Sequence, residues 1–225
     1  MSIKVNLDLA RAIKNRDNKM ETKEDNAIDS SYIRAFEIVA IAASADGLKA
    51  LIEILSALPF NFPVPIVIVK HISPKYPSFL TEILNRHTSL TVKHAEDGEK
   101  LHQSVVYIAP PDYHLLVKAN GIVELSQSPK VHFVRPSADV LFESVAQSYQ
   151  QGAIAVVLTG GDSDGSKGVE AIKKMGGIAI AQDRETSTVF GMPAAAIATG
   201  CVDFVLPLPE IAGAIATLVM TGGLS

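Results

Sequence analysis

The sequence is poor in cysteine, and only Cys201 among its 225 residues carries a thiol. A single cysteine excludes a disulfide framework and a site of paired cysteine ligands, and it is typical of a reducing compartment. No apolar run is long enough to cross a bilayer without an intervening proline, glycine or charge. The amino-terminal residues also lack the apolar core of a signal peptide. We therefore expect a cytoplasmic protein with no membrane insertion.

An excess of positive charge is missing as well. The formal net charge is −4 and the isoelectric point is near 5.9. Lysine and arginine are scattered, and no basic stripe is interleaved with aromatic residues. This balance argues against nucleic acid as the main partner. Hydrophobic residues make up 48% of the chain and charged residues 20%, which is typical of a globular protein with one substantial core.

The composition changes once along the chain. Residues 1–35 are polar and of mixed charge, and we expect a leader that is flexible or forms one short helix. Residues 36–225 alternate apolar runs with helical patterns, which predicts one α/β domain with a doubly wound, mostly parallel sheet and helices on both faces. The turn signal Ala119-Asn120-Gly121, between apolar runs at 114–118 and 122–125, predicts an antiparallel hairpin within this domain.

Three polar residues follow predicted strands. Ser44 lies in a turn of small residues after the first apolar run, His71 follows the second run, and Asp164 lies in a glycine-rich loop after a later one. The carboxyl ends of parallel strands share one edge of a sheet, where open α/β sheets bind their ligands. A hydroxyl, an imidazole and a carboxylate gathered there would act as nucleophile, general base and orienting acid.

The residues on either side of Ser44 are small, so a substrate carbonyl could approach closely. The backbone N–H groups of Ala45 and of either Gly160 or Gly161 are candidate donors to an oxyanion.

Each of these residues also has an ordinary structural interpretation. A serine between strand and helix is often a helix cap, a lone histidine is often structural, and aspartates in glycine-rich loops often bond to the turn backbone. The six histidines and the single cysteine show no metal-ligand spacing. The loop at 159–168 lacks the phosphate-loop pattern, and two carboxylates in it would repel phosphate. A calcium loop is disfavoured because the terminal glutamate is missing.

Seven short motifs occur in order along the chain: AASADG (42–47), KHIS (70–73), AEDG (95–98), VYIAPP (106–111), RPSADVLF (135–142), LTGGDSDG (158–165) and VFGMP (189–193). Over about residues 36–218, this ordered set resembles the catalytic domain of the chemotaxis protein-glutamate methylesterase family. The resemblance implies a doubly wound α/β esterase that hydrolyses glutamyl methyl esters on chemoreceptor signalling helices, also deamidates glutamines, and needs no cofactor.

The family's site residues fall on matching positions of this chain. The resemblance places the nucleophile at Ser44, the base at His71 and the orienting carboxylate at Asp164. We also expect the oxyanion hole and the substrate site to be shaped by four residues: Ala45, Gly160, Gly161 and Met192.

Several positions depart from the family pattern. The serine turn usually reads G-x-S-x-G-G, whereas here its first glycine is Ala42 and its penultimate glycine is Asp46. Lys70 stands where the family commonly has glutamine. Gly161 and Asp162 stand where it usually has methionine and glycine. These changes bear on catalytic efficiency and substrate choice.

The segment before Phe36 is too short for the receiver domain that many family members carry. We therefore expect a stand-alone esterase domain, with regulation supplied by a separate response regulator or another signalling protein. The alternative hypothesis is a catalytically weak or inactive binding or regulatory module on the same fold. A phosphate-ligand domain is a third and more distant alternative.

Overall fold

The computed structural model describes residues 36–72 and 78–221. The predicted polar leader at residues 1–35 lies outside these ranges, so its conformation stays a prediction. Within the two ranges, no helix combines the length and the apolarity that a membrane crossing requires.

Seven parallel strands form the central sheet, in the order β3-β4-β2-β1-β7-β8-β9. The strands are β1 (Ile38–Ala43), β2 (Ile66–Lys70), β3 (Thr91–His94), β4 (Val105–Ile108), β7 (Ala153–Val157), β8 (Ile178–Gln182) and β9 (Phe204–Leu206). Every residue of β1, β7 and β8 is buried, as expected for a parallel sheet covered on both faces. The continuous apolar runs that predicted these strands reflect that double burial.

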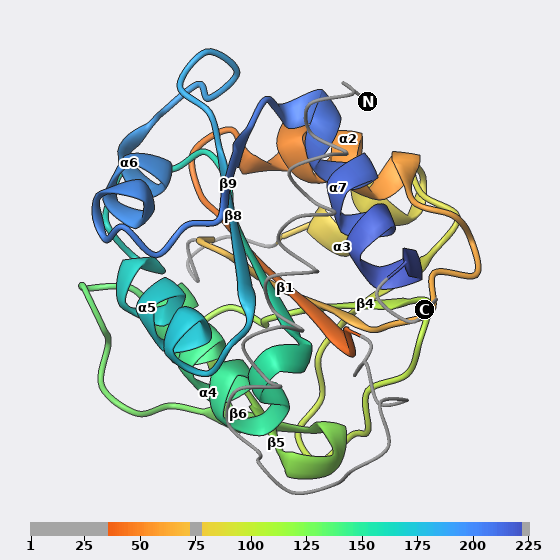
Figure 1. Cartoon of the computed structure of the whole chain (residues 1–225). Coiled ribbons are helices and arrows are strands. Elements are labelled where there is room, and N and C mark those ends of the chain that lie inside the picture. The colour runs from red at the N-terminus through yellow and green to blue at the C-terminus, as the bar shows by residue number, and fades with distance from the viewer. Residues whose placement is uncertain (1–35, 73–77, 222–225) are drawn as a thin grey trace, which may run out of the picture.

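Helices cover both faces of the sheet (Figure 1). One face carries α2 (Gly47–Ala57), α3 (Leu80–Asn85) and α7 (Leu208–Thr221), and the other carries α4 (Ala138–Tyr149), α5 (Ser166–Lys174) and α6 (Gly191–Ala198). Alternate residues of β1 point to opposite faces, so that Val39 and Ile41 join the first core while Ile38 and Ala40 join the second. The predicted doubly wound α/β fold is confirmed.

The predicted hairpin is also confirmed, although it forms a sheet of its own. β5 (His114–Lys118) pairs in antiparallel fashion with β6 (Ile122–Ser126), and the pair packs against α4 (Figure 1). Asn120 and Gly121 adopt φ angles of 66° and 72° in the connecting turn η1 (Ala119–Gly121), which are values that these residue types tolerate well.

The chain order places the site at the centre of the sheet. β1 has β2 on one side and β7 on the other, with Ala43 opposite Lys70 and Ala42 opposite Val157. The chain thus leaves β1 towards one half of the sheet and later returns to build the other half. Such a reversal of strand order opens a crevice at the carboxyl ends of the central strands, and Ser44 is the first residue after β1.

Candidate active site

Ser44 is held by the backbone of two neighbouring segments. Its N–H donates to the carbonyl of Thr159 (2.9 Å), and its carbonyl accepts from the N–H of Gly47 (3.0 Å). The N-cap of α2 is Asp46, with φ 55° and ψ 11°, and no side chain caps this helix. The capping interpretation of Ser44 is therefore wrong, and its hydroxyl is directed to a different partner.

That partner is the imidazole of His71. The backbone N–H of His71 donates to the carbonyl of Ala43 (3.1 Å), which places the ring just beyond β2. Nδ1 lies 3.2 Å from the Ser44 hydroxyl oxygen, and Nε2 lies 2.8 Å from Oδ2 of Asp164. An ionised carboxylate only accepts hydrogen bonds, so Nε2 carries the hydrogen of the neutral ring. Nδ1 then presents its lone pair to the hydroxyl of Ser44.

Asp164 is completely buried and accepts four hydrogen bonds. Oδ2 receives His71 Nε2 and the N–H of Ala138 (2.6 Å), while Oδ1 receives the hydroxyl of Ser137 (2.6 Å) and the N–H of Asp139 (3.1 Å). Burial acts to raise the pKa of Asp164, but these donors outweigh it and the pKa lies below its ordinary value. The carboxylate is thus held ionised at the amino-terminal end of α4.

Ser137 is the residue that the sequence interpretation missed. It occupies the N-cap position of α4, but it makes no side-chain bond to its own helix, and its hydroxyl orients Asp164 instead. His114, also buried, accepts the N–H of Ser137 at Nδ1 (3.2 Å) and lies with Nε2 3.2 Å from the carbonyl of Pro129. Burial lowers the pKa of His114. Ser137 lies in the motif at residues 135–142, but nothing in that motif indicates the hydrogen bond from Ser137 to Asp164.

Gly160 and Gly161, the alternative oxyanion donors, lie in the loop after β7, and their N–H groups differ in hydrogen bonding. The N–H of Gly160 donates to the carbonyl of Val189 (2.9 Å), so it is committed to the fold. The N–H groups of Ala45 and Gly161 have no hydrogen-bond partner within residues 36–72 and 78–221. A Cβ on Gly160 would lie 2.1 Å from the sulfur of Met192. Met192 therefore packs directly against the backbone beside the nucleophile.

Asp162, one of the departures from the family pattern, also reaches the imidazole. Its Oδ1 accepts the N–H of Asp164 (3.0 Å), as expected for an aspartate in a turn. Its Oδ2 lies 3.3 Å from Nδ1 of His71. Ser44 and Asp162 thus share the same ring nitrogen, and a hydrogen on Nδ1 would have two acceptors.

Two further departures, Asp46 in the turn after β1 and Lys70 at the end of β2, interact electrostatically. Burial lowers the pKa of the Lys70 amine, while the nearby carboxylate of Asp46 acts to raise it. The stem of Lys70 lies 4.0 Å from the position that a Cβ on Gly47 would take. The two substitutions therefore bring opposite charges together beside the serine turn.

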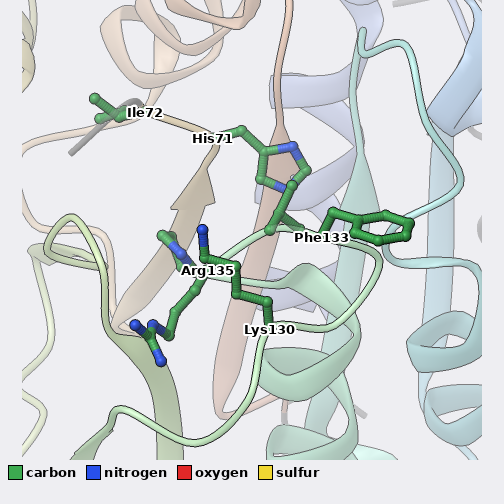
Figure 2. Close-up of a pocket in the computed structure, with 7 residues that line it drawn as sticks. His71, Ile72, Lys130, Phe133 and Arg135 are labelled. Atoms are coloured by element: carbon green, nitrogen blue, oxygen red, sulfur yellow. The ribbon is translucent and has the colours of Figure 1, made fainter. Parts of the chain in front are cut away.

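His71 also lines a pocket of about 260 Å³. It is lined by His71 and Ile72 after β2 and by Lys130 and residues 133–136 of the loop before α4. Figure 2 shows the His71 ring with Phe133 beside it. In the described part of the chain, no three His, Cys, Asp or Glu side chains lie close enough together to hold a metal ion.

Comparison with known proteins identifies the relatives of this chain. Residues 39–215 match the family model described as CheB methylesterase. The crystal structure of the Thermotoga maritima CheB methylesterase catalytic domain is 44% identical, with a TM-score of 0.79, and covers 83% of this chain and 100% of that one. A Leptospira interrogans protein is 41% identical over 177 residues, which are 79% of this chain and 92% of that protein.

Two further relatives are longer proteins. The Thermotoga maritima protein-glutamate methylesterase/protein-glutamine glutaminase is 46% identical over 178 residues, and the Pyrococcus abyssi protein of the same name is 42% identical over 176. Those stretches are 78% and 77% of this chain, but only 52% and 48% of the relatives. The chain thus spans about half the length of these two proteins.

Proposed function

The chain belongs to the CheB methylesterase family, and from that premise we propose that it is a serine hydrolase of glutamyl methyl esters on chemoreceptor signalling helices. The observation that carries the proposal is the continuous chain of hydrogen bonds from Ser44 through His71 to the buried Asp164. Hydrolysis of a glutamine amide at the same site would be the corresponding glutaminase reaction.

In the first half-reaction, the oxygen of Ser44 attacks the ester carbonyl while its proton passes to Nδ1 of His71. Asp164 stabilises the resulting imidazolium through Nε2. The N–H groups of Ala45 and Gly161 donate to the oxyanion of the tetrahedral intermediate. The proton on Nδ1 then passes to the departing methoxy oxygen, which leaves as methanol, and the glutamyl group remains esterified to Ser44.

In the second half-reaction, a water molecule takes the place of methanol. His71 accepts a proton from that water as it attacks the acyl carbon, and returns it to the oxygen of Ser44 as the acyl bond breaks. The product is a glutamate carboxylate, and the serine is regenerated. No step requires a cofactor. For a glutamine substrate the same steps release ammonia instead of methanol.

The alternative of an inactive regulatory module is not favoured. Such a module has no need for a buried carboxylate, Asp164, that accepts four hydrogen bonds. Nor does it need His71 placed between that carboxylate and the Ser44 hydroxyl. A buried polar arrangement of this kind requires every group to be satisfied and is therefore demanding to maintain. Its completeness in this chain supports catalysis.

Methanol release from methylated chemoreceptor fragments tests the proposal. Wild type should release methanol, and Ser44→Ala should lower the rate by several powers of ten, because the nucleophile is lost. Ser56→Ala is a matched control, since Ser56 is an exposed serine on α2 whose hydroxyl donates to the carbonyl of Glu53 in its own helix. Equal release by wild type and Ser44→Ala would refute the proposal.

A further inference from the structure

We propose that the hairpin at residues 130–135 is a docking element for the substrate protein, with Phe133 as an apolar anchor and Lys130 as a binding group for a carboxylate next to the reacting side chain. This inference rests on the proposed function, because it identifies the surface by which the same site would recognise its substrate. The partner chemistry is an acidic segment with an apolar residue on the face that carries the ester.

Phe133, at the tip of the hairpin, has a positive φ angle that bulky residues rarely adopt. Val131 and Val134 exchange backbone hydrogen bonds of 3.2 and 2.9 Å, and the two residues between them, His132 and Phe133, have φ angles of 48° and 65°. Asparagine and glycine are the usual residues in such a turn, and a bulky residue with positive φ is rare. Phe133 is 95% exposed, so it adds nothing to the core of the fold.

Arg135 holds the base of the hairpin, and His132 at its tip lies near a buried carboxylate. His132 Nε2 lies 3.2 Å from Oδ2 of Asp139, which is buried in the first turn of α4. Arg135 donates to Oδ1 of Asp112 from Nε (3.1 Å) and Nη2 (2.8 Å), and to the carbonyls of residues 127 and 128 (2.7 and 2.8 Å). A rigid display lowers the entropy lost on binding, so the exposed ring is preorganised for a partner.

The hairpin shares a pocket with His71, the proposed general base. Phe133 and Lys130 line the same pocket as His71 (Figure 2). Nδ1 of that His71 ring lies 3.2 Å from the Ser44 hydroxyl oxygen. The pocket volume of about 260 Å³ is below the roughly 300–1,000 Å³ of most small-molecule sites. It suits one side chain of a larger partner. A segment that fills this pocket beside His71 would contact the hairpin.

The charges on the rim match the chemistry of the substrate. Each turnover leaves a carboxylate, so a segment with several reactive side chains becomes acidic as it is processed. Arg135 is committed to Asp112, whereas Lys130 makes no ion pair with any carboxylate in the described ranges. Asp162, 3.3 Å from His71, instead disfavours a carboxylate at the reacting position. The neutral ester therefore fits beside Asp162, and neighbouring carboxylates fit beside Lys130.

Binding and kinetics of three variants test this docking element. Phe133→Asn removes the ring but keeps a residue that suits positive φ. Lys130→Gln removes the charge. Phe60→Asn is the matched control, because Phe60 is 72% exposed and lies before β2, at the opposite edge of the sheet. Binding of a methylated chemoreceptor fragment is measured by fluorescence anisotropy with each change added to Ser44→Ala, so that hydrolysis does not interfere.

We expect Phe133→Asn to raise the dissociation constant about tenfold, as for an interface anchor. Lys130→Gln should raise it roughly threefold at low salt, an effect that disappears near 0.5 M salt because an exposed charge pair is screened. Phe60→Asn should leave it unchanged. With the nucleophile present, Phe133→Asn should raise KM for the fragment with little change in kcat, and should lower kcat/KM for p-nitrophenyl acetate much less than for the fragment.

Two outcomes separate this inference from the proposed function. If wild type releases methanol but Phe133→Asn binds the fragment within twofold of its parent, the docking inference is overturned and the esterase proposal stands. If the fragment binds through Phe133 but no methanol is released, the esterase proposal fails and the docking surface stands. A Ser44→Ala protein that binds no methylated fragment also overturns the docking inference.

Discussion

Asp164→Asn changes the charge of the buried carboxylate while keeping its shape. Each carboxylate oxygen accepts one backbone N–H, from Ala138 at Oδ2 and from Asp139 at Oδ1, plus one side-chain donor. The amide NH2 group must replace one of these oxygens, so it faces a backbone N–H in either orientation. One buried donor is therefore left without an acceptor.

The loss of stability follows from these contacts. A buried donor without a partner costs about 1–3 kcal/mol, and loss of the charge at the start of α4 adds roughly 0.3–2 kcal/mol. We expect Asp164→Asn to lower the free energy of unfolding by about 2–4 kcal/mol at pH 7. When the NH2 group faces Nε2 of His71, the ring must carry its hydrogen on Nδ1 and cannot accept the proton of Ser44. This tautomer change should lower kcat roughly 10⁴-fold.

The stability difference should also depend on pH. The pKa of Asp164 is lower in the folded protein than its ordinary value, despite burial, because of its four donors. Its stabilisation is therefore fully present above the ordinary pKa of about 4 and is lost as the pH falls through the folded value. Urea unfolding of wild type and Asp164→Asn should give curves that converge as the pH drops below about 4.

Initial rates at pH 7 complete this experiment. Unfolding free energies within about 0.5 kcal/mol of each other at pH 7 would contradict the hydrogen-bond account, since they are far below the expected loss. A kcat within tenfold of wild type would contradict the role of the carboxylate in orienting His71.

Three substitutions probe the surroundings of the site. Gly160→Ala places a methyl group against the sulfur of Met192, and we expect urea unfolding to show a loss of about 1–3 kcal/mol with a fall in esterase rate; unchanged values would contradict the close packing. Ser137→Ala removes one donor from Asp164 and should lower stability by about 1 kcal/mol, with a smaller fall in kcat than Asp164→Asn; an equal fall would argue against this ranking. Asp46→Gly relieves a left-handed residue and should raise stability by up to about 1 kcal/mol in thermal unfolding, and a loss would show that the charge matters more than the strain.

The sequence was sufficient to predict the strands and the place of the site. A parallel strand that is buried on both faces of the sheet has a continuous apolar sequence. For this reason β1, β2 and β7 could be predicted from their own residues. Because these strands end at one edge, Ser44, His71 and Asp164 could be expected to meet before any distance was known. The turn residues Asn120 and Gly121 likewise predicted the hairpin.

The parts that were wrong or missed depend on contacts between distant segments. Ser137 stands at the N-cap position of α4, but its hydroxyl bonds a carboxylate 27 residues further along the chain. Gly160 and Gly161 are equivalent as candidate donors in the sequence, but in the structure the N–H of Gly160 donates to the carbonyl of Val189. The reach of Asp162 to His71 depends on the path of a loop. Local residue preferences carry no information about such partners, because tertiary packing decides them.

Labelling with a fluorophosphonate probe tests most directly whether Ser44 is an activated nucleophile. The structure predicts a single covalent adduct, located on Ser44 by mass spectrometry of peptides, because Nδ1 of His71 lies 3.2 Å from its hydroxyl oxygen. His71→Gln, which keeps a polar side chain but removes the base, should slow labelling at least about 100-fold. Wild type that forms no adduct, or forms it on another serine, would contradict the central claim.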